Sequence, residues 1–120
     1  MNKVLNVLLH IDDYDNWENV CNNAEELLKM SEVGNYAMNL EIVVNGEAVK
    51  NLANGNINVL TLKDCLRKLH DKGVFIYCCS KSLQENNVDP SVIFSFVEIV
   101  PSGIFHIVLR ETNNFTYIKP

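Results

Sequence analysis

Two adjacent cysteines end one of the most apolar runs of the sequence. The run "GVFIYCCSKSL", residues 73–83, places Cys78 and Cys79 directly before a polar segment. Neighbouring residues of a strand point to opposite faces, so these two thiols cannot readily bind one metal ion. The chain also lacks the paired C-x2-4-C spacing that is typical of structural zinc sites. We therefore expect no metal site.

The same two cysteines cannot form a relaxed disulfide with each other. Consecutive Cα atoms lie about 3.8 Å apart, whereas the Cα atoms of a relaxed disulfide lie about 4.4 to 6.8 Å apart. Strand alternation places Cys78 on the same face as Val74 and Ile76, which is typical of a core residue. It leaves Cys79 on the opposite face, at the end of the strand. The two thiols are therefore expected to have different environments.

Cys79 directly precedes a segment that can begin a helix. If a helix begins at Ser80 or Lys81, Cys79 lies at its N-terminus, where the helix dipole and the free backbone amides stabilise a thiolate. The ammonium group of Lys81 adds positive charge nearby. The residues alone leave two interpretations open: Cys79 is a reactive thiol, or both cysteines are simply buried at a strand end.

The order of the predicted elements decides where Cys79 lies in the fold. Short apolar runs predict strands over residues 3–10, 39–46, 74–79 and 96–101. Helical spacing of apolar residues predicts helices that begin near Trp17 and over residues 61–73. This alternation predicts an α/β fold with three layers, in which helices cover both faces of a mostly parallel five-stranded sheet, flavodoxin-like in outline.

Ligands of such sheets bind at the carboxyl ends of the strands. The residues at these predicted ends are His10, Asn45 with Gly46, Cys79, and Pro101 with Ser102. His10 has two interpretations. It is either a proton donor or acceptor beside Cys79, or a histidine that only makes local hydrogen bonds. The predicted site thus lies at the edge where Cys79 ends its strand.

The C-terminal stretch fits two structures. Residues 103–120, "GIFHIVLRETNNFTYIKP", have the β-branched content of a hairpin that turns at Asn113 and Asn114. The same residues also fit a helix over residues 102–113 followed by a strand over residues 115–120. The preceding alternation of strands and helices favours the helix, because a β-α-β unit has short connections.

The remaining cysteines and histidines fall within predicted helices. Cys21 and Cys65 each lie on the apolar stripe of a helix, so we expect both to be small buried residues. His70 and His106 are expected to have only surface or packing roles.

The composition is that of an ordinary globular protein, and we expect residues 1–120 to form a single domain. The chain is 48% hydrophobic and 21% charged. Its formal net charge of −5 argues against binding to nucleic acid or to anionic membranes. The apolar runs are too short to span a bilayer, and the N-terminus does not read as a signal peptide. We therefore expect a cytoplasmic protein whose four cysteines are thiols.

The acidic segment after the first predicted strand bears on cofactor binding. The segment "IDDYDN" offers carboxylates where a phosphate group would need amides and hydroxyls. This disfavours a flavin mononucleotide site, and we expect no cofactor.

Five segments lie in register along nearly the whole chain and together match one known family. They are "VLLHIDDYDNWENVCNNAEELL", "LEIVVNGEAV", "GVFIYCCSKSL", "VPSG" and "TYIKP". These segments resemble the DsrE/DsrF-like sulfur-relay family, which includes the YchN-like proteins. The first is similar to the first strand and helix of that family, and the next three match its patterns "IEVVxNGxAV", "GVxxxxCxxxL" and "VPxG". The last matches its closing tyrosine segment.

The resemblance implies a fold, an assembly and a chemistry. It implies parallel strands, a helix after "VPSG", and small homo-oligomers, either trimers or hexamers. Sulfur-relay members use a cysteine at the position of Cys79. They load it as a persulfide and pass the sulfane sulfur to a partner protein. Cys78 matches a position that is merely apolar in the family.

From these observations we expect a cytoplasmic sulfur carrier that acts between a donor and an acceptor protein. Cys79 would hold the sulfur, and the backbone after it, at Ser80 and Lys81, would stabilise its negative charge. The helix start at Ser102 and Gly103 would add to this, and His10, Asn45 and Gly46 would line the pocket. The alternative is a non-catalytic oligomeric module that binds a small ligand or a protein segment in the same pocket.

Overall fold

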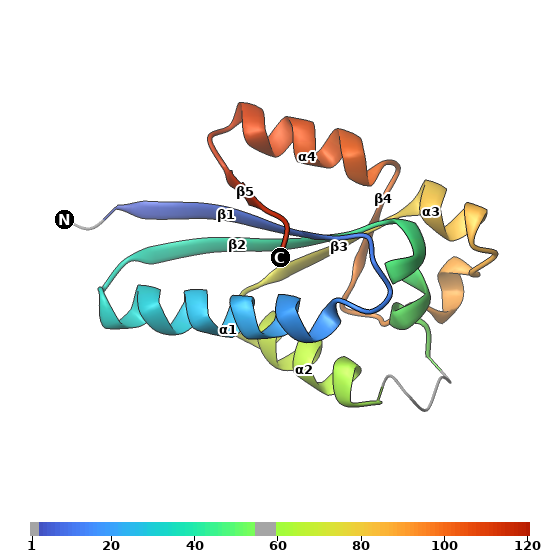
Figure 1. Cartoon of the computed structure of the whole chain (residues 1–120), viewed down its shortest axis with the longest axis horizontal. Helices are drawn as coiled ribbons and strands as arrows, with labels where there is room; N and C mark the ends of the chain where they lie inside the picture. The colour runs from blue at the N-terminus through green and yellow to red at the C-terminus, as the bar shows by residue number, and fades with distance from the viewer. Residues whose placement is uncertain (1–2, 55–59) are drawn as a thin grey trace.

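A computed structural model describes residues 3–54 and 60–120 of the chain (Figure 1). Its centre is a sheet of five strands in the order β4-β3-β2-β1-β5. The strands are β1 (Val4–Ile11), β2 (Ala37–Val44), β3 (Phe75–Cys79), β4 (Glu98–Val100) and β5 (Thr116–Ile118). Every neighbouring pair of strands is parallel, which confirms the predicted sheet.

Helices lie on both faces of the sheet. Helices α1 (Trp17–Val33) and α2 (Leu60–Asp71) cover one face, and α4 (Gly103–Thr112) covers the other (Figure 1). The predicted three layers are therefore confirmed. In the described part of the chain, none of the helices is long and apolar enough to cross a membrane.

Three short helices follow the inner strands. The 3-10 helix η1 (Gly46–Leu52) follows β2, α3 (Ser80–Glu85) follows β3 without a break, and the 3-10 helix η3 (Pro90–Val92) leads toward β4. In Figure 1, η1 and α3 lie together at the end of the sheet where the central strands finish. This is the carboxyl edge at which the sequence predicted a site.

The apolar core has two parts because the central strands are buried on both faces. The larger part lies between the sheet and helices α1 and α2, and the smaller part lies between the sheet and α4. Cys78 is fully buried in the larger part together with Val74 and Ile76, while Tyr77 belongs to the smaller part. The prediction that Cys78 is a core residue is confirmed.

The C-terminal stretch forms a helix and a strand, as the alternation pattern predicted. The Ser102 side chain caps α4, because its hydroxyl oxygen accepts a hydrogen bond of 3.1 Å from the backbone N–H of Phe105. The chain then crosses the sheet, and β5 pairs with β1 at the far edge. The β-branched residues that favoured a hairpin are accommodated in α4.

A buried ion pair joins α4 to the sheet. Glu41, in β2, is only 6% exposed. The Nε–H of Arg110 donates to both of its carboxylate oxygens, at 2.9 and 2.8 Å, and His106 Nε2 lies 2.8 Å from one of them. The His106 ring also lies 4.3 Å from the Tyr77 ring, centroid to centroid. His106 thus has a polar role in addition to the packing role that was predicted.

Candidate functional site

Cys79 occupies the N-cap position of α3. The last residue of β3 has extended backbone, and the helix begins at Ser80, as the sequence predicted. The Cys79 sulfur accepts a hydrogen bond of 3.4 Å from the backbone N–H of Ser82. The side chain is largely enclosed, and only 5% of Cys79 is exposed. A sulfur at this position faces the unpaired amides of the first helical turn.

The two adjacent thiols have opposite acidities. Burial raises the pKa of the Cys79 thiol, but hydrogen bonds from the Ser82 hydroxyl and from the backbone N–H groups of Gly103, Ser82 and Lys81 lower it by more. The pKa of Cys79 therefore lies below its ordinary value. Burial, together with the negative charge of Cys79, raises the pKa of Cys78 to about 12. Of these two thiols, only Cys79 has an environment that favours the thiolate form.

Ser82 is a site residue that the sequence reasoning missed. It is 5% exposed, and its hydroxyl oxygen accepts a hydrogen bond of 2.8 Å from the backbone N–H of Gly46. Because the oxygen accepts there, the hydroxyl hydrogen remains available to the Cys79 sulfur, and a hydrogen bond between the two side chains lowers the pKa of Cys79. The spacing of three residues between a helix N-cap and a serine would have been the signal for it.

Gly46 has the backbone geometry that this contact requires. Its φ is +58°, in the left-handed region that favours glycine, and a Cβ atom there would lie 2.9 Å from the Asp12 carbonyl oxygen. The Asn86 side chain donates to the Gly46 carbonyl at 3.3 Å and to the Ser82 carbonyl at 2.8 Å. The turn after β2 and the first turns of α3 are therefore joined beside the sulfur.

Gly103 brings the start of α4 to the same sulfur. A Cβ atom at Gly103 would lie 3.3 Å from the Cβ atoms of both Asn45 and Cys79, which is closer than most such contacts in proteins. The absence of a side chain lets the Gly103 N–H reach the thiol. The predicted contribution of this helix start thus comes from Gly103, while Ser102 caps the helix by bonding to Phe105.

His10 lies at this edge but bonds to other residues. It is 5% exposed, with Nε2 2.8 Å from the Asn45 side-chain oxygen and Nδ1 2.5 Å from the Tyr117 hydroxyl. Because the Asn45 oxygen can only accept, Nε2 carries the hydrogen and Nδ1 accepts from Tyr117. Both ring nitrogens are thus occupied, so this geometry favours the interpretation of His10 as a hydrogen-bonding residue. Tyr117 was not among the predicted site residues.

Ser80 and Lys81 contribute less through their side chains than was expected. Ser80 is half-buried at the first position of α3, and it is not one of the groups that lower the pKa of Cys79. The Lys81 side chain is exposed, and this residue acts on the sulfur through its backbone N–H and not through its ammonium group. Backbone N–H groups therefore stabilise the Cys79 thiolate, in place of the Lys81 ammonium charge that was predicted to do so.

The fold is similar to that of several solved structures. A protein of unknown function, MTH1491 from Methanobacterium thermoautotrophicum, matches with a TM-score of 0.80 and 24% identity over 100% of both chains. BT1422 from Bacteroides thetaiotaomicron, also of unknown function, matches with a TM-score of 0.71 and 17% identity over 99% of this chain and 95% of that one. The ychN protein of E. coli matches with a TM-score of 0.66 and 14% identity over 100% of both chains. At such identities the likeness concerns the fold alone.

Family membership follows from the sequence itself. No curated protein matches the chain. The model of the DsrE/DsrF-like family, however, matches residues 4–115, which include every element from β1 to α4 and all the residues that donate hydrogen bonds to the Cys79 sulfur. The chain therefore belongs to the DsrE/DsrF-like family.

Proposed function

We propose that this protein is a cytoplasmic sulfur-relay carrier of the DsrE type, in which Cys79 holds sulfane sulfur as a persulfide. The observation that supports this is the set of donors around the Cys79 sulfur. They come from the first turn of α3 and from the start of α4, and they lower the pKa of the thiol despite its burial. Thiolate is the form that attacks a persulfide.

The proposed step is a thiol exchange. The Cys79 thiolate attacks the terminal sulfur of a donor persulfide, R–S–SH. The S–S bond of the donor breaks, a new S–S bond forms on Cys79, and the donor leaves as the thiolate R–S⁻. The amides that favour the Cys79 thiolate also favour a persulfide anion at the same place. An acceptor thiolate then removes the sulfur by the same chemistry, and Cys79 returns to its starting form.

The alternative function is a non-catalytic oligomeric module that binds a small ligand or a protein segment. The specific observation in its favour is that only 5% of Cys79 is exposed, which leaves little of the sulfur open to a donor. In that case the donors around Cys79 would be structural. One experiment separates the two functions.

The test is to incubate the protein with a cysteine desulfurase and free cysteine, and to measure the intact mass. We expect one added sulfur on the wild type, none on Cys79→Ser, and one on Cys78→Ala, because Cys78 is buried in the core on the other face of β3. The Cys78→Ala variant is the matched control for the loss of a neighbouring thiol. A wild-type protein that gains no sulfur, or loading that persists in Cys79→Ser, would favour the binding module.

We further propose that the carrier is a homo-oligomer, a trimer or a hexamer, that assembles through α4. The outer face of this helix carries four large apolar side chains, which are 44–61% exposed. They are Ile104, Phe105, Val108 and Leu109. Exposed apolar patches of this kind are typical of protein interfaces. Because α4 begins at the Cys79 site, a second copy seated on it would lie near the sulfur.

We expect the wild type to sediment at three or six times the 13.6 kDa of one chain. Phe105→Glu should sediment as a single chain, since it places a charge in the apolar face. The control is Met30→Glu, which changes a side chain of similar exposure (59%) on α1, on the other side of the sheet, and should leave the assembly unchanged. A monomeric wild type, or an assembly that tolerates Phe105→Glu, would contradict this proposal.

A further inference from the structure

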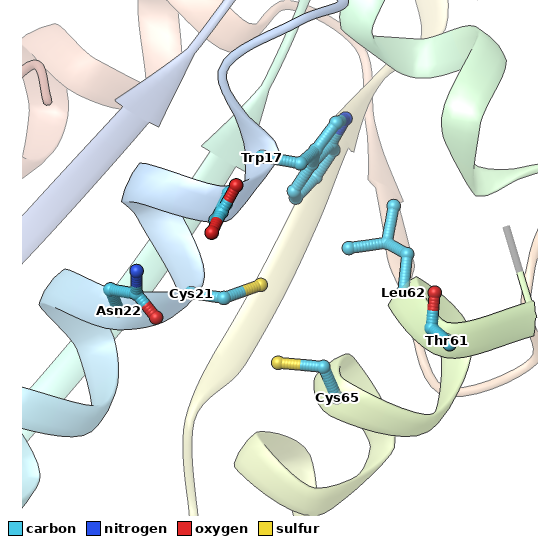
Figure 2. Close-up of a pocket in the computed structure, with 7 residues that line it drawn as sticks. Trp17, Cys21, Asn22, Thr61, Leu62 and Cys65 are labelled. Atoms are coloured by element: carbon cyan, nitrogen blue, oxygen red, sulfur yellow. The ribbon is translucent and has the colours of Figure 1, made fainter.

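A second pair of cysteines lies between α1 and α2. Figure 2 shows the sulfur atoms of Cys21 and Cys65 pointing toward each other from the two helices. The two thiols are within hydrogen-bonding reach of each other. The sequence predicted each of them separately as a small buried residue, and Cys21 is indeed only 9% exposed, while Cys65 is half-buried. Because the two thiols lie opposite one another, they could react with each other.

A cavity of about 330 Å³ opens beside this pair (Figure 2). Both cysteines line it, and so do the exposed residues Glu18, Asn22 and Thr61, which place its mouth at the surface. A small reagent can therefore approach the sulfurs from solvent. Cys65 is the more exposed of the two thiols, so it is the one that such a reagent meets first.

We propose that Cys21 and Cys65 form a dithiol–disulfide site, which reacts with low-molecular-weight disulfides to give a reversible disulfide between α1 and α2. The Cys65 thiolate attacks one sulfur of a small disulfide R–S–S–R. That S–S bond breaks, a mixed disulfide forms on Cys65, and R–S⁻ leaves. Cys21 then loses its proton to water and attacks the Cys65 sulfur, and the second R–S⁻ leaves. Two protein thiols are oxidised, and one small disulfide is reduced to two thiols.

The structure assigns the order of these two steps. The cavity beside Cys65 provides space for the R–S group of the mixed disulfide. Burial raises the pKa of Cys21, and so do its hydrogen bond to Cys65 and the negative charges of Cys65 and Glu25. Cys21 is thus protonated at neutral pH, which suits a thiol that reacts second. The second step should become faster as pH rises, because a larger fraction of Cys21 is then thiolate.

The other thiol arrangements of the chain do not offer this chemistry. Cys78 and Cys79 are neighbours on one strand, and their side chains belong to opposite faces of the sheet. Among the described residues, no third histidine, cysteine, aspartate or glutamate joins Cys21 and Cys65 in a group that could hold a metal ion. The pair is therefore better suited to thiol exchange than to a metal.

The test uses the full chain in a Cys79→Ser background, so that the proposed carrier thiol cannot react. The probe is 2-hydroxyethyl disulfide, a neutral reagent, and the readout is the intact mass followed by peptide mapping. We expect the protein to lose two hydrogen atoms and to yield one peptide pair joined through Cys21 and Cys65. Dithiothreitol should restore the original mass.

Two single variants distinguish this result from simple labelling. Adding Cys21→Ala should stop the reaction at a stable mixed disulfide on Cys65, while adding Cys65→Ala should leave Cys21 unmodified. Adding Cys78→Ala, the matched control, should leave disulfide formation as it was. A mixed disulfide that persists when both Cys21 and Cys65 are present would overturn the proposal, and so would a bond that involves Cys78. Because this test does not use Cys79, its outcome is independent of the proposed sulfur transfer.

Discussion

Replacing Gly103 by valine is expected to raise the pKa of Cys79 by about 1 to 2 pH units, because a hydrogen bond to a charged group contributes about 1.5–3 kcal/mol. A Cβ atom at Gly103 would already lie 3.3 Å from the Cβ atoms of Cys79 and Asn45, and the branched valine side chain adds further atoms there. The start of α4 must then move away from the sulfur, and the Gly103 N–H no longer reaches it. At a pH well below the wild-type midpoint, the thiolate fraction should fall about 10- to 100-fold.

The measurement is the ultraviolet absorbance of the thiolate during a pH titration, taken as the difference between each protein and its own Cys79→Ser counterpart. In the wild type this difference should show a step below the ordinary cysteine value of about 8.5. The donors lower the pKa of an acid, so losing one moves the step to higher pH. This optical readout does not require a reagent to reach a sulfur that is 5% exposed.

Ser102→Ala is the control for a general loosening of α4. It removes the helix cap, which costs about 1 kcal/mol of stability, but it adds no atom between Gly103 and the sulfur. Its titration step should stay close to that of the wild type. If the step also stays unchanged in Gly103→Val, the donors of α3 alone hold the thiolate, and the role assigned to α4 is wrong.

Replacing Arg110 by methionine is expected to lower the free energy of unfolding by about 3 kcal/mol at pH 7. The change leaves the Glu41 carboxylate buried in the sheet without the guanidinium that contacts both of its oxygens. The low end of the usual range applies because the Arg110 side chain is 28% exposed and water can partly replace it. Urea denaturation followed by circular dichroism measures this loss.

Two further variants sharpen this prediction. Lys68→Met breaks the ion pair between Lys68 and Asp64, whose side chains are 69% and 64% exposed. It should cost much less stability than Arg110→Met, because water and salt screen an exposed pair. The double variant Glu41→Leu with Arg110→Met removes both buried charges, so it should be more stable than Arg110→Met alone. Equal losses for Arg110→Met and Lys68→Met would mean that the Glu41 pair is as well hydrated as a surface pair.

The environment of Cys79 could largely be predicted from local sequence. The apolar run that ends at Cys79 and the polar segment after it predicted both the strand end and the helix start. Alternation along the strand separated Cys79 from Cys78. Such features depend on residues within a few positions of each other. Over that distance the side-chain periods of strands and helices determine which residues share a face.

The remaining parts of the site depend on contacts that a local pattern does not contain. Glu41 lies 65 and 69 positions from its partners His106 and Arg110, and His10 lies 107 positions from Tyr117. The sequence around a glutamate in an apolar run does not indicate which distant basic residue will pair with it. In the same way, each helical stripe identified Cys21 and Cys65 as buried, but only the packing of α1 against α2 places them opposite each other.

The order in which the chain is synthesised bears on the acidity of Cys79. Cys79 leaves the ribosome before Gly103, whose backbone N–H lowers the pKa of the Cys79 thiol. A nascent chain that ends before α4 therefore lacks that donor. Pairing of β5 with β1 then closes a loop of most of the chain, which costs conformational entropy before the new contacts compensate for it. The lowered pKa of Cys79 thus requires a part of the chain that is made well after the strand that carries it.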